Sequence, residues 1–343
     1  MRPLLVFVTA VFSLSAFGAL PSYNVVDLGP GSAIAISENG NVLGSTNGQL
    51  WRYIGGSRKN LPYSRGSGAG DINDVGQVAA EGMSSGQGSY EAFYFDGTAG
   101  HTYTYDYNVI ALRFRSINES GVAVGYGLMP GDVGSDDFCY ENGWQWLSPW
   151  HGGAVTIRNN GEIAYNREYT PYPEGMPNEN EWKSIWVGGR PLAMPDPEAV
   201  YAYPINFTAD GSLVGCYCTP TNSPYVCNIN EHWFTWNGQQ FKIVLEGTAE
   251  TPLVLDFMNG NSNGDLVGYD LCIDGTLGSV SDLESAGWTI TYAYDINDAG
   301  QIVGTGVNAA GETRAVLLNP IPEPATTGIL LDGLIMLLKR WRR

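Results

Sequence analysis

The chain has 343 residues, including 45 glycines and 19 prolines, and only 15% of its residues are charged. This composition favours many short strands and tight turns, and it excludes long amphipathic helices, whose period is absent from the body of the chain. The formal net charge of −18 argues against a nucleic-acid partner, whose phosphates would be repelled, and permits divalent cations and basic or neutral partners.

The first residues have the pattern of a secretory signal peptide. Arg2 supplies a positive charge, residues 4–14 form a short apolar run, and the small residues Ala16 and Gly18 suit a cleavage site. We therefore expect residues 1–18 to direct export and residues 20–320 to form the exported body.

The body repeats one phrase, in which an apolar residue and three further residues precede a glycine. Residues 72–76 read Ile-Asn-Asp-Val-Gly, and residues 296–300 read Ile-Asn-Asp-Ala-Gly. The seven glycines that end the phrase are Gly40, Gly76, Gly121, Gly161, Gly211, Gly264 and Gly300. Their mean spacing is about 43 residues, which is typical of a four-stranded propeller blade.

Each phrase predicts a tight turn between two strands. Glycine adopts positive φ freely, and Asn or Asp tolerates the left-handed region and satisfies turn backbone. An apolar pair follows the turn, as at Ile302 and Val303, and a second glycine such as Gly304 often closes the phrase. Adjacent apolar residues indicate a strand that is covered on both faces, as in a sheet between two others.

A second phrase, rich in aromatic residues, falls between most copies of the turn. It occupies residues 50–53, 92–95, 144–146, 184–187 and 232–236, and residues 314–318 are a less aromatic copy. Each unit then holds four strands. The body starts with a strand at residues 23–28 that has no preceding strand in its unit. It ends with a strand at residues 314–318 that has no following strand in its unit. We therefore predict an all-β, seven-bladed, propeller-like ring that the two ends close; an open β-solenoid is the alternative.

Two stretches carry a resemblance to a known family. Residues 71–78 read Asp-Ile-Asn-Asp-Val-Gly-Gln-Val, and residues 292–304 repeat the same pattern. Both resemble HAF-type extracellular repeats, with similarity over about residues 22–318. The resemblance implies secretion and residence at the cell surface or in the matrix, and it carries no catalytic residues.

The C-terminal residues 321–343 resemble a PEP-CTERM sorting tail, which exosortase-type enzymes recognise. The motif residues are Pro322, Glu323 and Pro324, followed by an apolar run and then Lys339, Arg340, Arg342 and Arg343. The basic cluster should stay cytoplasmic. The apolar run, residues 328–338, is shorter than the roughly 20 residues of a stable span and contains Asp332. We expect a short hydrophobic helix that acts as a transient signal, with a permanent anchor as the alternative.

Few residues predict catalysis. His101, His151 and His232 lie far apart and are interpreted as structural. A Walker-type phosphate loop does not occur. We therefore predict a non-enzymatic binding or structural module, and the alternative is a carbohydrate-binding or carbohydrate-cleaving propeller, since carboxylates are plentiful. No cofactor is predicted. Residues 71–76, 259–265 and 295–300 partly resemble calcium loops, but turn chemistry explains the same residues.

The five cysteines suit an oxidising compartment. A disulfide between Cys227 and either Cys216 or Cys218 is predicted, and buried free thiols are the alternative. Tryptophans could form sugar-stacking platforms, but most lie in the recurring strand phrase and are interpreted as blade core. These tryptophans are Trp51, Trp144, Trp146, Trp186, Trp233, Trp236 and Trp288.

Unit length varies mainly in one connection, from the strand after the turn to the next aromatic strand. The long cases are residues 127–137, 167–181 and 216–231. In an antiparallel meander these loops share the face opposite the turns, which predicts a binding face there, with neutral drift in loop length as the alternative. Their acidic and aromatic residues suit a cationic or divalent-bridged polysaccharide. These residues are Asp132, Asp136, Asp137, Glu168, Glu174, Glu179, Glu181, Tyr169, Tyr172 and Tyr225.

Overall fold

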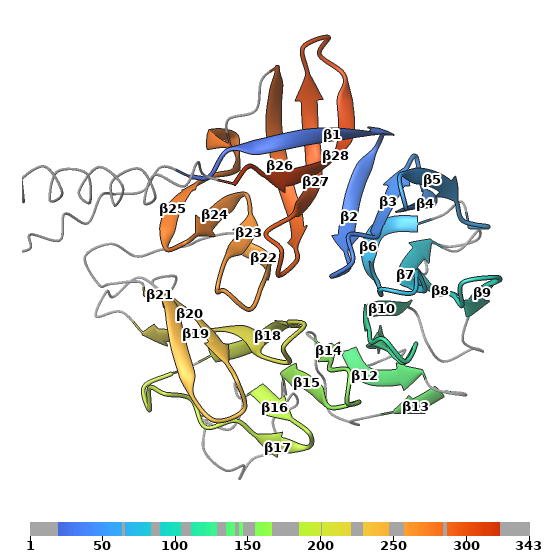
Figure 1. Cartoon of the computed structure of the whole chain (residues 1–343). Coiled ribbons are helices and arrows are strands. Elements are labelled where there is room, and N and C mark those ends of the chain that lie inside the picture. Colours follow the sequence, from blue (N-terminus) through green and yellow to red (C-terminus); the bar gives the residue numbers. More distant parts are fainter. Residues whose placement is uncertain are drawn as a thin grey trace, which may run out of the picture.

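The computed structural model is an all-β propeller, as the sequence predicts (Figure 1). It describes residues 20–63, 66–83, 90–103, 111–128, 135–140, 144–146, 155–166, 185–199, 201–220, 229–246, 257–283 and 287–322. Within these ranges the strands form six sheets, and the single helix is the short 3₁₀ helix η2 (Val280–Asp282). No helix in the same ranges is long and apolar enough to cross a bilayer.

Four of the sheets are meanders of four antiparallel strands, consecutive in the chain. One contains β2 (Ser32–Ile36), β3 (Val42–Thr46), β4 (Gln49–Ile54) and β5 (Ser57–Asn60). Another contains β14 (Val155–Ile157), β15 (Ile163–Asn166), β16 (Ile185–Val187) and β17 (Arg190–Pro191). The third contains β18 (Tyr201–Phe207), β19 (Leu213–Pro220), β20 (Ile229–Trp236) and β21 (Phe241–Glu246). The fourth contains β22 (Phe257–Gly260), β23 (Leu266–Gly268), β24 (Asp270–Ile273) and β25 (Thr276–Ser279).

The largest sheet has eight strands in two antiparallel runs. The first run is β6 (Gly66–Ile72), β7 (Val78–Met83), β8 (Tyr90–Phe95) and β9 (Gly100–Tyr103). The second run is β10 (Ala111–Ile117), β11 (Ala123–Leu128), β12 (Ser135–Tyr140) and β13 (Trp144–Trp146). One parallel pair, Ala111 with Tyr90, joins the runs. The predicted count of seven blades therefore differs from the six sheets that backbone pairing defines in the described ranges.

The two ends of the body share the remaining sheet. Its order is β1 (Tyr23–Pro30), β28 (Thr313–Pro320), β27 (Ile302–Asn308) and β26 (Trp288–Ile296), and β1 runs antiparallel to β28 with Val25 opposite Leu318. In Figure 1 the blue β1 lies against the red strands from the other end of the chain. This pairing confirms the predicted closure, and the alternative of an open solenoid is wrong because the two ends of a solenoid would remain apart.

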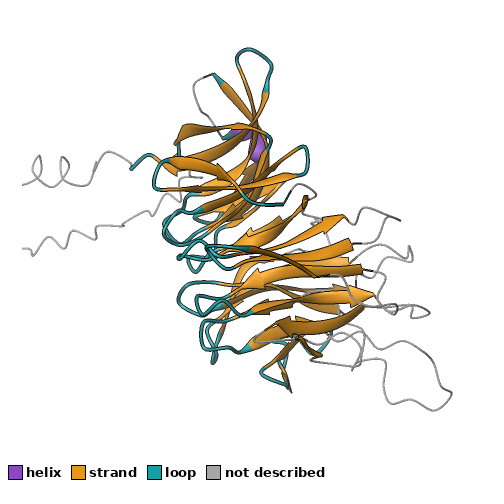
Figure 2. Cartoon of the chain, turned by 90° about the vertical axis from the view of Figure 1, so that its right-hand side faces the viewer, coloured by secondary structure: helices purple, strands orange, loops and turns teal. Residues whose placement is uncertain are grey.

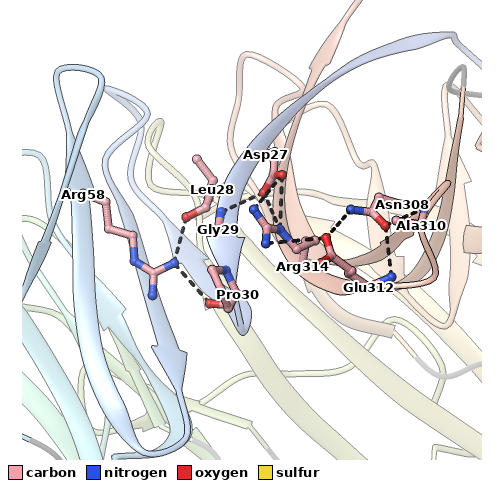
Figure 3. A network of polar contacts seen from close by, with 9 residues as sticks. All are labelled: Asp27, Leu28, Gly29, Pro30, Arg58, Asn308, Ala310, Glu312 and Arg314. Atoms are coloured by element: carbon pink, nitrogen blue, oxygen red, sulfur yellow. Dashed lines mark hydrogen bonds and ion pairs between the residues drawn. The ribbon is translucent and has the colours of Figure 1, made fainter.

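Side chains reinforce the closing sheet (Figure 3). Arg314 on β28 donates from Nε to both carboxylate oxygens of Asp27 on β1, at 3.1 and 3.2 Å. Burial acts to raise the pKa of Asp27, but the hydrogen bonds from Arg314 and the Gly29 amide outweigh it and lower that pKa. Arg58 on β5 donates to the carbonyl oxygens of Leu28 and Pro30, so it also ties β1 to the neighbouring sheet.

The core lies between neighbouring sheets. Val42 and Trp51 from β3 and β4 pack with Val303 and Leu317 from β27 and β28. Val42 and Leu43 are the apolar pair that follows the turn, and Leu43 packs on the opposite side from Val42, against residues of β6 and β7. Both faces of β3 are therefore covered, as predicted. Full burial of each such side chain stabilises the fold by about 1.5–3 kcal/mol.

Candidate functional site

The innermost strand of each meander faces the axis of the ring. β2, β6, β10, β14, β18, β22 and β26 contact one another in this order, and β26 contacts β2. They enclose a cavity of about 390 Å³, and a second cavity of about 200 Å³ continues from it to the turns that end these strands. Ile36, Glu38 and Asp71 line both cavities, so together they form one channel with a mouth at the turns. In the side view of Figure 2 the turns of several neighbouring sheets gather along one edge of the stack.

The repeated turns surround this mouth. Their seven glycines take positive φ, from 72° at Gly300 to 92° at Gly264. Each glycine amide donates back to the second residue of its phrase, as Gly76 N does to Asn73 O at 2.9 Å. A side chain at this φ would be strained, which explains glycine at this position.

Asparagine at the second position of the phrase links one turn to the next. Asn73 accepts from Gln77 N at 2.9 Å through Oδ1, and its Nδ2 donates to Asn118 O of the following unit at 3.0 Å. Asn118 repeats the pattern toward Arg158 O, and Asn297 repeats it toward Ser37 O across the closure. The repeated phrase predicts only the turn conformation of these asparagines; their hydrogen bonds between units depend on the ring and are not evident from the phrase.

Carboxylates at the third position of the phrase also link one turn to the next. Glu119 accepts from Asp74 N at 3.0 Å, and Glu38 accepts from Asp298 N at 3.0 Å. Burial raises the pKa of Glu38 to about 7, and the nearby charges of Asp298, Asp74 and Glu119 contribute. Burial likewise raises the pKa of Glu119. The mouth of the channel is therefore strongly acidic.

Two further carboxylates lie in the channel wall. Asp71 accepts from Ile72 N at 2.8 Å and from Ile117 N of the next unit at 2.9 Å. Asp295 accepts in the same way from Ile296 N and from Ile36 N, both at 2.8 Å. Burial raises the pKa of Asp71 to about 6 and holds the pKa of Asp295 well above its ordinary value. Because both oxygens of each group bind backbone amides, these carboxylates primarily connect adjacent inner strands.

β-Bulges direct a second set of side chains into the channel. In five inner strands the register shifts around an unpaired residue that lines the cavity. β26 has a second shift at Thr291, which is not among the lining residues. The five bulged residues are Ile34, Arg115, Ile205, Met258 and Tyr294. A bulge re-aims the side chain of the extra residue, so these strands turn one additional side chain toward the axis.

The second glycine of the repeated phrase makes room for the bulge. Gly125 lies opposite Phe114 and Gly304 lies opposite Ala293, each where the register shifts. A Cβ on Gly125 would lie 1.9 Å from Arg113 O, and one on Gly304 would lie 2.0 Å from Tyr292 O. The bulged residue always stands two positions before the first residue of the turn phrase, which is a signal that the sequence carries.

On one side of the channel the bulged residues are apolar or aromatic, and Asn206, Asn259 and Asp295 lie next to them on the same three strands. Ile205, Met258 and Tyr294 come from the neighbouring strands β18, β22 and β26, and Met258 is 47% exposed. Arg115 and Asp71 come from β10 and β6 on the other side. Arg115 donates from Nη2 to the hydroxyl of Tyr126 at 2.8 Å.

An aromatic path leads away from Tyr294. Its ring centroid lies 4.3 Å from that of Tyr292, which lies 4.3 Å from that of Tyr269. Tyr269 is 56% exposed. The aromatic residues that line the main cavity are Tyr203, Phe207, Phe257 and Tyr294. Trp51 and Trp233 are buried in the core, as predicted.

The structure places the other predicted residues as follows. Cys216 and Cys218 are buried, and neither forms a disulfide with another cysteine in the described ranges; Cys227 lies outside these ranges, so the disulfide stays a prediction. His232 is buried with Nε2 at 2.9 Å from Thr219 Oγ1, whereas His101 is exposed beside Asp96. Within the described ranges no cluster of three or more His, Cys, Asp or Glu could hold a metal ion.

Most of the predicted sorting tail and parts of the three long connections lie outside the described residues. Pro322 is the last described residue, so the other tail residues and the expected short helix lie outside the described part, as do residues 1–19. The three long connections contain residues 129–134, 167–184 and 221–228, which also lie outside it. The strands that flank these connections pair at Leu128 with Ser135, Asn166 with Ile185 and Pro220 with Ile229. These pairs form the strand ends remote from the turns.

Fold and channel together define a β-propeller with a central cavity of ligand size. No protein-family model matches the chain, and no curated protein sequence matches it. Solved structures of similar fold include the extracellular domain of a one-component system protein from B. thetaiotaomicron, with a TM-score of 0.46, 11% identity and coverage of 88% of this chain. The chain spans only 40% of that protein.

Two enzymes are similar at the same level. Hydrazine synthase from Kuenenia stuttgartiensis has a TM-score of 0.45 at 12% identity, over 86% of this chain and 97% of that one. Acylaminoacyl peptidase from Pyrococcus horikoshii has a TM-score of 0.46 at 12% identity, over 89% of this chain and 54% of that one. Similarity at this level concerns the fold alone.

Proposed function

We propose that this protein is an exported β-propeller that acts as a binding or structural module at the bacterial cell surface or in the extracellular matrix, and not as an enzyme. The central channel carries the proposal, since its volume of about 390 Å³ lies in the range of small-molecule sites. The wall carboxylates Asp71 and Asp295 favour binding over catalysis, because an oxygen that accepts backbone hydrogen bonds is poorly placed for proton transfer or nucleophilic attack.

The eight-stranded sheet is best interpreted as two blades, which gives a ring of seven. Each of its runs has its own turn phrase, at Gly76 and at Gly121. The inner strands β6 and β10 contact each other as neighbours elsewhere in the ring do, and among the described residues the pair Ala111 and Tyr90 is the one strand pairing that joins the runs. This interpretation gives every unit one inner strand at the channel.

The location follows from the two ends of the chain. Residues 1–18 serve as the secretory signal, and residues 321–343 serve as a PEP-CTERM-type tail for an exosortase-type enzyme, with residues 20–320 as a HAF-type repeat domain. Strand β28 ends at Pro320, one residue before the Pro-Glu-Pro motif begins at Pro322. The tail can therefore be processed without disturbing the ring. The partner that we propose outside the cell is an extracellular polysaccharide.

Replacement of Pro322, Glu323 and Pro324 by alanine tests the sorting role. In the native bacterium the variant should accumulate in the membrane fraction as an unprocessed form, visible by its size on a gel. Replacement of Thr326 and Thr327 by alanine is the control, because it changes the tail outside the motif. The sorting role is wrong if the motif variant matches the parent in location and size.

Attachment tests the binding role. Purified protein should bind to cells or to extracted matrix of the same bacterium. Attachment equal to that of an unrelated protein of similar negative charge would contradict the proposal.

A further inference from the structure

We propose that the central channel recognises an uncharged sugar unit of a glycan, and that the bulged residues of the inner strands determine its specificity. This inference rests on the proposed function, since it names the ligand class of the same binding module. It is carried by one geometric feature, the bulge that re-aims a single side chain from each of five inner strands into the cavity.

The residue type at the bulged position differs between units, whereas the residues around it recur. The turn residues and the apolar pair repeat because every unit needs them to fold. The bulged residue is Ile in two units, Arg in another, Met in another and Tyr in another. Folding therefore requires the bulge but not a particular side chain on it. Such bulges are over-represented next to binding and catalytic sites, where they re-aim a side chain.

The apolar and aromatic bulged residues on one side of the channel suit the C–H face of a sugar ring. Ile205, Met258 and Tyr294 lie on successive inner strands, and Met258 leaves 47% of its surface exposed. Aromatic and polarizable side chains provide flat apolar area with little loss of side-chain entropy on binding. Tyr292 and Tyr269 extend this area toward the surface, with ring centroids 4.3 Å apart. A chain of sugar units could follow this path while one unit occupies the cavity.

The polar groups of the channel match hydroxyls. Glu38 uses Oε2 for the Asp298 amide, and Asn259 uses Oδ1 for the Gly260 amide. Among the described residues, Glu38 Oε1, Asn259 Nδ2 and the Tyr294 hydroxyl have no further hydrogen-bond partner. Arg115 retains donors beyond the one that binds Tyr126. Acceptors and donors thus stand side by side, and a hydroxyl group can satisfy both.

Charged ligands fit this wall less well. Glu38, Asp71 and Asp295 would repel an anion, and in the main cavity Arg115 is the only described cation that opposes them. Arg158 lines the second cavity, where it is paired with Glu162 at 2.6 Å. A small cation would lie against Arg115 and the apolar bulged residues without a cluster of ligands to hold it. An uncharged, hydroxyl-rich ring satisfies both sides of the channel at once.

Calorimetry with the purified full-length protein tests the proposal. The probes are maltohexaose, cellohexaose and chitohexaose, which are neutral, together with hexagalacturonate and a glucosamine hexamer, which are charged. At least one neutral probe should bind more tightly than both charged ones. Met258→Trp should fill the channel and weaken that binding at least tenfold. Leu277→Trp is the matched control, because Leu277 is 44% exposed on the outermost strand of the same sheet; it should bind as the parent does.

A second variant removes a charge from the channel without adding bulk to it. Arg115 is exposed, so Arg115→Met should leave the thermal unfolding midpoint unchanged and weaken binding about tenfold, the equivalent of one or two lost charge-assisted hydrogen bonds. Equal affinity in the parent, Met258→Trp and Arg115→Met would overturn the assignment. So would preference for a charged probe, or failure of every neutral probe to bind. If the protein still attaches to cells or matrix in that case, the sugar site is wrong and the binding role stands.

Discussion

Asn73 shows how one residue type can serve both a turn and the ring. Its Oδ1 accepts the Gln77 amide inside the turn, and its Nδ2 donates to Asn118 O in the next unit. Aspartate lacks the donor and alanine lacks both groups, so only an amide side chain of this length closes the two bonds. Asn118, Asn261 and Asn297 occupy equivalent positions with the same pair of bonds.

Asn73→Ala should lower the free energy of unfolding by about 1–3 kcal/mol, because it leaves the Gln77 amide unpaired and removes one of the two hydrogen bonds to the buried Asn118 carbonyl, which keeps only that from the Gly121 amide. Urea denaturation followed by fluorescence measures this change. Asn39→Ala is the control, since the Asn39 side chain is exposed in a turn of the same kind, and its effect should stay within about 0.5 kcal/mol. Equal losses in the two variants would show that the asparagine contributes nothing between units.

The geometry of the inner strand β26 depends on a glycine in the neighbouring strand β27. Gly304 on β27 faces the bulge of β26, where the Tyr292 carbonyl approaches too closely for any Cβ. Without that glycine β26 would have to shift away from β27 or lose its bulge. The same relation holds for Gly125 and β10.

Gly304→Ala should therefore lower the free energy of unfolding by about 1–3 kcal/mol, the usual cost of forcing extra atoms into a packed site. Thermal and urea unfolding measure the loss. Gly311→Asn is the control: its φ of 78° is tolerated by asparagine and nothing lies within 4 Å of its Cβ position, so stability should hardly change. A Gly304→Ala variant as stable as the parent would mean that the bulge is not fixed by this contact.

Some elements follow from the sequence and others do not. The turns and the pairing of residues 23–28 with 314–318 were predictable, because the phrase recurs and both ends present incomplete units. The channel residues were not. Ile34 and Ile205 look like ordinary core residues, since a bulge shifts the alternation by one and the periodicity alone hides it. The roles of the asparagines were missed because a bond between units depends on the ring, which local propensity does not describe.

At the scale of the whole molecule, carboxylates with raised pKa gather at one mouth of the ring. Burial raises the pKa of Glu38 to about 7 and that of Asp71 to about 6, whereas both types titrate near pH 4 in an unfolded chain. Between about pH 4 and 7 the folded protein therefore binds more protons than the unfolded chain. The free energy of unfolding should fall as the pH rises through this window.

The thermal unfolding midpoint should accordingly decrease from pH 5 to pH 8. Glu38→Gln should flatten this dependence between pH 6 and 8 and raise the midpoint at pH 8, because it removes a carboxylate that is costly to ionise beside Asp298, Asp74 and Glu119. Glu198→Gln removes one charge from an exposed position as a control. A midpoint that rises from pH 5 to pH 8 would contradict this account of the mouth.

The pairing of β1 with β28 also sets an order of events during folding. Asp27 and Arg314, which meet in the closing sheet, are 287 residues apart. Contacts of such separation form slowly, since the chain must lose loop entropy before they stabilise it. A chain that emerges from its N-terminus onward must keep β1 unpaired until residues 313–320 have appeared. Until then β1 and β27 both present open edges, so the nascent propeller passes through an aggregation-prone stage that ends only with its last strand.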